Sequence, residues 1–118
     1  MSEKNLKVSV LLDYYGKLLT QKQLDVTELY YNEDLSLGEI SELENISRQG
    51  VRDSIKRAEA FLFELEDKLE MVKKFSEVSD SLERINTLAT AALDGGSGDV
   101  KESFAKIKNE ANKALKIV

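Results

Sequence analysis

The chain has 118 residues, 42% of them hydrophobic, and it contains no cysteine, histidine or proline. This length fits one domain, or a small domain with an extension, and the missing cysteine and histidine exclude disulfides, thiolate zinc sites and imidazole bases. The net charge of -5 argues against a generic nucleic-acid binder. We therefore expect no enzyme and no cofactor or metal site.

The first segment predicts a helix over about residues 4–18, because apolar residues recur there every four positions. They are Leu6, Val10, Tyr14 and Leu18. The segment lacks the charged start, apolar stretch and cleavage site of a signal peptide. No run of about 18 apolar residues follows that could span a membrane. We expect a cytoplasmic protein without membrane insertion.

Three helix starts follow, and all have the same form. A hydroxyl residue suited to an N-cap stands at Thr20, Ser36 and Ser47. Three positions further on stand Gln23, Glu39 and Gly50, and apolar residues flank each start as Leu19 and Leu24, Leu35 and Ile40, and Ile46 and Val51. Such caps satisfy free backbone N–H groups, and the apolar pairs fix the entry of the chain. The pattern predicts helices beginning near residues 21, 37 and 48.

Gly50 differs from its two counterparts and has two interpretations. An acidic residue there would repel phosphate, and a large one would hold the helix away from a DNA groove. Alternatively, the position only tolerates a small residue, at a cost to the helix of about 1 kcal/mol.

Residues 35–57 predict a helix-turn-helix, in which a second helix enters the major groove. Asn45 takes the place of the usual turn glycine and tolerates the left-handed conformation. Glu44 precedes it where an apolar residue is usual, and Leu43 stands one place earlier, which predicts shifted inner packing. Residues 47–57 hold four basic residues and one acidic residue, whereas residues 1–46 and 58–94 each hold four basic and nine acidic. Within the first three quarters of the chain, the positive charge is thus concentrated on the proposed recognition helix, while residues 95–118 hold five basic and three acidic residues.

From Ser47 no stop occurs until the segment DGGSG at residues 94–98. Apolar residues follow a heptad seam at Val51, Ile55, Ala58, Leu62, Leu65, Leu69 and Val72. The seam continues to Ala92 after a shift of register, and we expect a break within residues 73–81. Asp99 with Glu102 predicts the cap of a last helix, packed in the same chain or against a partner. We expect two domains, a helix-turn-helix domain at 1–58 and a helical extension for dimerisation at 59–118.

The segments LTQKQ, ELYYNEDLSLGEI and ISRQGVRDSIKR resemble the promoter-reading C-terminal region of bacterial sigma factors. They are still more similar to the YlxM-type family of small bacterial helix-turn-helix proteins, over roughly residues 10–70. The resemblance implies an all-α fold with a wingless helix-turn-helix, DNA binding and a homodimer. It also implies a link to the signal recognition particle pathway through gene neighbourhood. Arg52 stands where that family tends to have an aromatic residue.

The candidate DNA-binding residues lie mainly at the start of the helix after Ser47. Arg48, Gln49 and Arg52 are expected to contact base edges, since arginine pairs with guanine and glutamine with adenine. Residues suited to phosphate contacts are Ser47, Lys56, Arg57 and Lys22. In the competing interpretation, Arg48 and Arg52 are solvated or pair with Asp53 and nearby acids.

Two functions therefore remain open from the sequence. The first is a DNA-binding regulatory protein that acts as a homodimer. The second is a protein-interaction adaptor that has kept the scaffold and binds signal recognition particle components through helical surfaces. Four tyrosines offer a stacking platform for single-stranded RNA or, more commonly, core packing: Tyr14, Tyr15, Tyr30 and Tyr31.

Overall fold

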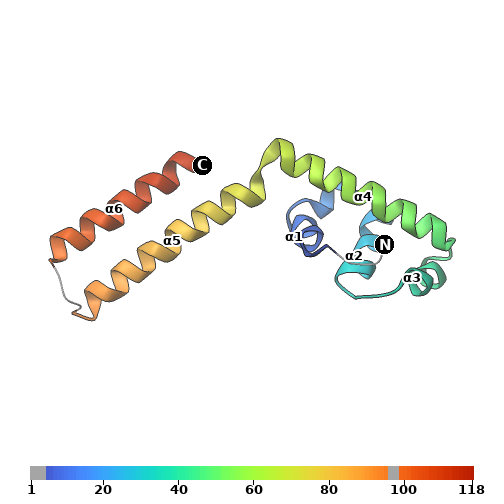
Figure 1. The fold of residues 1–118 in the computed structure, drawn as a ribbon, viewed down its shortest axis with the longest axis horizontal. Helices are drawn as coiled ribbons and strands as arrows, with labels where there is room; N and C mark the ends of the chain where they lie inside the picture. The colour runs from blue at the N-terminus through green and yellow to red at the C-terminus, as the bar shows by residue number, and fades with distance from the viewer. Residues whose placement is uncertain (1–4, 96–98) are drawn as a thin grey trace. The chain divides into compact units, whose positions relative to one another are not determined.

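The computed structural model describes residues 5–95 and 99–118. Within these residues the secondary structure consists of helices, without a strand: α1 (Leu6–Tyr15), η1 (Gly16–Leu18, a 3-10 turn), α2 (Gln21–Tyr31), α3 (Leu37–Glu44), α4 (Arg48–Leu69), α5 (Met71–Leu93) and α6 (Val100–Ile117) (Figure 1). The predicted all-α fold is confirmed. Contacts divide the chain into two units, Met1–Val72 and Lys73–Val118, which we describe separately. The functional division at residues 58 and 59 stays a prediction.

The three predicted helix starts are present at the expected residues. The side chains of Thr20 and Ser36 each accept a hydrogen bond from the backbone N–H three positions on, and Gln23 and Glu39 bond back to the cap N–H. The Ser47 hydroxyl accepts from the Gly50 N–H at 2.9 Å. Local hydrogen bonding therefore sets where α2, α3 and α4 begin.

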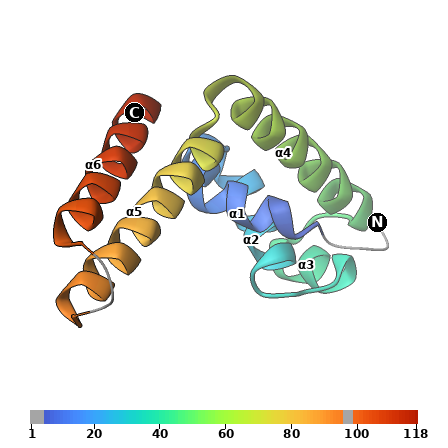
Figure 2. The ribbon, with the colours of Figure 1, turned by 60° about the vertical axis from the view of Figure 1, so that its left-hand side comes forward.

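The first unit has α4 as its spine, with α1, α2 and α3 along one side of it (Figure 2). Two clusters of buried residues form the core. The first joins α1 to the second half of α4 through Val8, Leu11, Leu12, Tyr15, Leu19, Ala58 and Leu62. The second joins α2 and α3 to the first half of α4 through Val26, Tyr30, Ile40, Val51 and Ile55. Burial of these side chains packs the helix-turn-helix, formed by α3 and α4, against α1 and α2.

The prediction of which apolar row of the first helix packs against the core was wrong. The α-helix ends at Tyr15, and the expected start at residue 4 lies outside the described residues. The four residues of the expected stripe are exposed by 40% to 81%: Leu6, Val10, Tyr14 and Leu18. The row that includes Leu11, Leu12 and Tyr15 is buried instead, because it meets α4. This helix carries two apolar rows, and periodicity alone does not choose between them.

The long helix ends earlier than expected, at Leu69 instead of within residues 73–81. Glu70 takes the left-handed conformation, with φ 53° and ψ 30°. The Tyr15 hydroxyl donates to Glu66 Oε1 at 2.5 Å and accepts from the Met71 N–H at 3.0 Å. Glu66 Oε1 also accepts from the Val72 N–H at 3.0 Å. These bonds satisfy the first N–H groups of α5 and stabilise the break.

The first part of the predicted heptad seam lies inside this unit. Val51, Ile55, Ala58 and Leu62 are all 0% exposed. They pack against α1, α2 and α3 of the same chain, so they cannot form a seam with a second chain.

In the second unit, α5 and α6 run side by side in opposite directions (Figures 1 and 2). The last helix thus packs within its own chain, and the Asp99 side chain caps it by accepting from the Lys101 N–H at 3.0 Å. Residues 96–98 of the expected turn lie outside the described residues.

Tyr15, Tyr30 and Tyr31 serve packing, as the commoner of the two interpretations expects, whereas Tyr14 is 40% exposed. Tyr15 and Tyr30 are 1% and 5% exposed. Tyr30 and Tyr31 meet edge to face, with ring centroids 5.0 Å apart, and the Tyr31 hydroxyl donates to Glu59 Oε1. The arrangement leaves no row of parallel rings on which bases would stack.

Candidate nucleic-acid interface

The start of α4 borders an open hollow of about 440 Å³. Its walls come from the first turn of α3 and the first turns of α4: Ser36, Leu37, Gly38, Arg48, Gln49 and Arg52. All three residues expected to contact bases therefore share one surface. The wall from α3 was missed in the sequence, because nothing in the spacing of LSLG shows which side chain it will face.

The burial of α4 decides how these side chains point. Val51 and Ile55 face the core, and at about 100° per residue Arg48 and Arg52 fall on the flank beside that buried row. Arg48 is exposed and Arg52 is half-buried. The two guanidinium groups thus stand at the edge of the helix nearest to α3, on the border of the hollow.

Gln49 and Asp53 occupy the part of α4 that points furthest from the core. The Gln49 amide donates to Asp53 Oδ1 at 2.9 Å. Asp53 was not among the predicted DNA contacts, although a carboxylate can accept from the amino group of cytosine. The central position of this pair means that any ligand lying along α4 meets an amide and an acid together.

In the competing interpretation, Arg48 and Arg52 are either solvated or paired with acids. Pairing finds no support in the described residues, whereas solvation agrees with the exposure of Arg48. No salt bridge there includes Arg48 or Arg52. The acid nearest in sequence, Asp53, is bonded to Gln49 instead.

The remaining predicted residues are more scattered. Lys56 is exposed one turn beyond Arg52, and Arg57 is exposed on the other flank of α4. The Ser47 hydroxyl is the N-cap of α4. Lys22, at the start of α2, donates from Nζ to the Glu44 carbonyl at 3.4 Å, at the end of α3. Ser47 and Lys22 thus both have structural contacts within the helix-turn-helix.

The turn between α3 and α4 adopts the conformation expected of Asn45. This residue is left-handed, with φ 55° and ψ 45°, and its N–H bonds to the Ser41 carbonyl. Leu43 is 65% exposed and does not replace the missing apolar residue. The inner side of the turn is filled by Ile40, which is buried, and by Ile46, which packs against the same core cluster.

Gly50 lies against its own cap. A Cβ atom at this position would stand 3.2 Å from the Ser47 hydroxyl oxygen and 3.8 Å from Ile46 Cδ1. The Ser47 hydroxyl would have to shift by a few tenths of an ångström, so Gly50 has a local packing role besides any role toward DNA.

Among residues 5–95 and 99–118, no group of three or more acidic, histidine or cysteine side chains is placed to hold a metal ion. No helix in the described part of the chain is both long and apolar enough to cross a membrane.

The chain is similar to one family of proteins over most of its length. A family model described as "Putative helix-turn-helix protein, YlxM / p13 like" (UPF0122) matches residues 2–94. A UPF0122 protein of Desulforamulus reducens is 49% identical over 110 residues, which cover 92% of this chain and 91% of the relative. A UPF0122 protein of Clostridium novyi is 45% identical over 111 residues, which cover 91% of this chain and 94% of that relative. The helix-turn-helix predicted from the sequence is therefore confirmed at the level of the family.

Proposed function

Because this chain belongs to the UPF0122 family of YlxM / p13-like helix-turn-helix proteins, we propose that it is a non-enzymatic, cytoplasmic regulator that binds double-stranded DNA. The observation that carries the proposal is the hollow at the start of α4, where Arg48, Gln49 and Arg52 lie together. The helix-turn-helix is wingless and similar to that of sigma factors.

In this proposal the exposed start of α4 enters the major groove. Arg48, Arg52 and Gln49 contact base edges, each good bidentate pair giving roughly 1–3 kcal/mol of discrimination. Lys56 and Arg57 contact phosphates on either side of the helix. Ser47 and Lys22 act indirectly. Ser47 caps the start of α4, and Lys22 bonds to the end of α3, so both hold the turn of the helix-turn-helix in place. A homodimer places two such helices on half-sites about 34 Å apart.

The test is a fluorescence titration with DNA fragments selected from a random library. We expect Arg48→Ala plus Arg52→Ala to weaken binding to the selected sequence at least tenfold and to relax the sequence preference, because each lost base contact costs about 1–3 kcal/mol of discrimination. The matched control is Lys17→Ala plus Lys74→Ala, which removes the same charge from exposed positions on other helices. Equal affinity and equal sequence preference of the two double variants would refute the assignment of the contacts.

A second candidate is an adaptor that binds signal recognition particle components through its helical surfaces. The net charge of -5 favours it, as does the acid at the centre of the outward face of α4. Capture of such components by the double arginine variant as well as by the wild-type chain, with no DNA sequence selected from the library, would favour the adaptor.

A further inference from the structure

The α5–α6 hairpin has a thin interface of its own. The residues of α5 and α6 that face each other are partly buried and small or medium in size, among them Val78, Ile85, Ile107 and Ala114. Ser81, which is 2% exposed, is the one buried side chain in the described part of these two helices after Val72. Two helices with no fully buried apolar side chain between them gain little from burial. Large apolar side chains of the hairpin therefore remain exposed to solvent.

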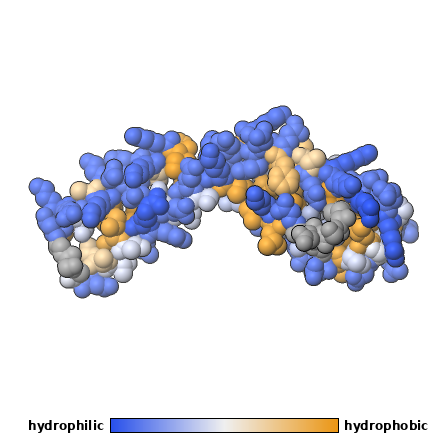
Figure 3. All heavy atoms as spheres, in the orientation of Figure 1, coloured by the Kyte–Doolittle hydropathy of each residue, from blue (hydrophilic) through white to orange (hydrophobic). Residues whose placement is uncertain are grey.

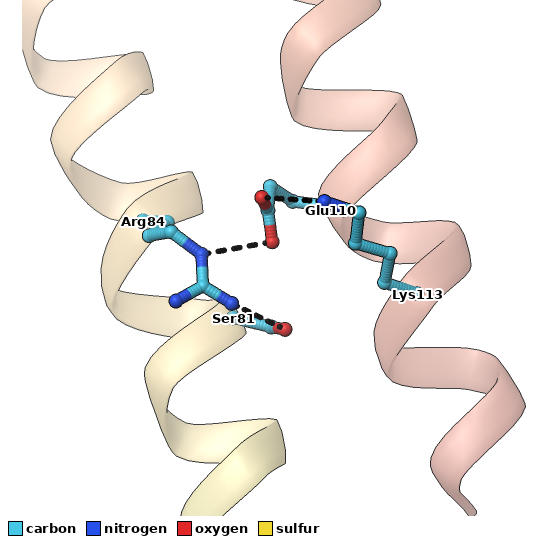
Figure 4. Close-up of polar contacts among 4 residues, drawn as sticks. All are labelled: Ser81, Arg84, Glu110 and Lys113. Atoms are coloured by element: carbon cyan, nitrogen blue, oxygen red, sulfur yellow. Dashed lines mark hydrogen bonds and ion pairs between the residues drawn. The ribbon is translucent and has the colours of Figure 1, made fainter.

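One face of the hairpin is polar and fixes how the helices are aligned (Figure 4). Arg84 Nε on α5 lies 3.0 Å from Glu110 Oε2 on α6. Lys113 Nζ lies 3.5 Å from Glu110 Oε1, and Arg84 Nη2 donates to Ser81 Oγ at 3.3 Å. The Arg84 guanidinium lowers the pKa of the Glu110 carboxyl below its ordinary value. This network holds α5 and α6 in one register.

The other face is apolar. Large side chains on it are 55% to 87% exposed, namely Phe75, Leu82 and Leu93 on α5, Val100, Phe104 and Leu115 on α6, and Val118 directly after α6. On each helix this row lies about a quarter turn from the residues that face the other helix, in the same rotational sense. Because the helices are antiparallel, both rows point to the same side of the hairpin. Figure 3 shows the orange side chains of this hairpin between rows of blue ones. We call these seven residues the apolar face.

We propose that the apolar face of one chain binds the apolar face of a second copy of the same chain, so that two hairpins form a four-helix bundle. The inference gives the homodimer of the proposed function a definite interface, but it does not depend on DNA binding. Four-helix bundles bury this kind of row between antiparallel helix pairs, and a twofold axis brings the same patch of both chains together.

The size of the apolar face favours a second copy. Each of the seven side chains is more than half exposed. Since a Phe residue alone has about 150–250 Å² of surface to bury, the two Phe, three Leu and two Val residues together expose on the order of several hundred Å². A stable dimer of standard size buries about 800 Å² on each partner, and a monomer rarely exposes a patch above a few hundred Å². The two small residues near the middle of the face, Ala89 and Ala111, are partly buried and leave room for close approach of a second pair of helices.

The test is sedimentation velocity of the full-length chain without DNA. We expect a dimer at micromolar concentration. Leu82→Glu plus Phe104→Glu puts two charges on the apolar face and should weaken the dimer about a hundredfold or more, because an unpaired charge is costly to bury. The control is Thr87→Glu plus Ala105→Glu, which adds the same charge at exposed positions outside the face and should leave the dimer intact. Far-UV circular dichroism must give the same helix content for all three proteins.

A second measurement covers the case in which the charged variant does not fold. The chain has no cysteine, so a single cysteine at residue 111 or 87 is the only thiol. With a short bismaleimide, Ala111→Cys should give covalent dimer in high yield and Thr87→Cys little. A monomeric wild-type chain would overturn the homodimer and its interface together. A dimer that survives Leu82→Glu plus Phe104→Glu, or cross-links equally from both positions, would overturn the interface alone.

Discussion

Gly38 and Arg48 share one space at the border of the hollow on α4. A Cβ atom at residue 38 would stand 3.0 Å from Arg48 Nη2, 3.2 Å from Cζ and 3.3 Å from Nε. The guanidinium group therefore lies against the first turn of α3, and a Cβ atom at residue 38 would require it to shift by a few tenths of an ångström.

The first prediction tests this relationship. If Gly38 helps to hold Arg48 in place, Gly38→Ala should shift the Arg48 guanidinium and weaken DNA binding, by less than about tenfold because the side chain is flexible. The same change should leave thermal stability equal or higher, since alanine favours the helix by up to about 1 kcal/mol. DNA affinity by fluorescence titration and unfolding by circular dichroism measure the two effects.

The control for Gly38→Ala is the same change in an Arg48→Ala background. If Gly38 acts through Arg48, Gly38→Ala should cause no further loss of DNA affinity in the Arg48→Ala background. The double-mutant cycle should then give an interaction energy near the full effect of Gly38→Ala. Equal losses in both backgrounds would contradict the positioning role.

The second prediction separates the two interpretations of Gly50. Gly50→Gln and Gly50→Glu each supply the capping-box residue found at the starts of α2 and α3, and they differ mainly in charge. If the position lies near phosphate, Gly50→Glu should bind DNA several-fold more weakly than Gly50→Gln at low salt, and the gap should close at high salt. Identical affinities at both salt concentrations would leave only the packing role against Ser47.

The third prediction concerns alkaline pH. Burial, together with the hydrogen bond to Glu66, raises the pKa of Tyr15 above its ordinary value of 10.0. Burial and Glu59 raise the pKa of Tyr31 in the same way. A raised pKa in the folded state means that the neutral hydroxyl stabilises the fold fully below about pH 10, and that this stability is lost as the pH rises further.

Comparison of the wild-type chain with Tyr15→Phe isolates this effect. The difference between their free energies of unfolding in urea should be largest near pH 8 and should shrink above about pH 10. Ultraviolet titration of tyrosinate should give a later midpoint for the folded wild-type chain than for the urea-unfolded chain. A difference that stays constant to high pH would show that the Tyr15 hydroxyl does not titrate in this range.

The fourth prediction concerns Glu70, a non-glycine residue in the left-handed region. That conformation costs an ordinary residue about 1–2 kcal/mol. Glu70→Gly should therefore raise the free energy of unfolding, by about 0.5–1 kcal/mol after the greater freedom of glycine in the unfolded chain is included. Ala60→Gly, at an exposed position within α4, is the control and should lower it by about 1 kcal/mol. A loss of stability in both variants would contradict the strain at Glu70.

The sequence predicts those parts of the fold that depend on neighbours along the chain. The caps at Thr20, Ser36 and Ser47 fix three helix starts, because each is completed within three residues. The turn at Asn45 is predictable for the same reason. The buried positions of α4, such as Val51 and Ile55, follow from its period.

Features that depend on distant contacts were not predictable in this way. The break at Glu70 has no glycine or proline to mark it, and it is held by Tyr15, far away in the sequence. The face that α1 buries was chosen by α4. At the candidate interface the arginines were identified from their type and position, but the wall formed by Gly38 and the bond from Gln49 to Asp53 follow from where the helices meet.

The burial of Val51 and Ile55 has a consequence for the proposed binding of DNA. The helix that carries Arg48 and Arg52 is also the spine of the core, so its backbone is already ordered before any ligand arrives. Binding then orders side chains only, and little conformational entropy is lost. Substitutions at the surface of α4 should accordingly change the lifetime of the complex more than its rate of formation. The proposed recognition surface is thus preorganised by the hydrophobic core.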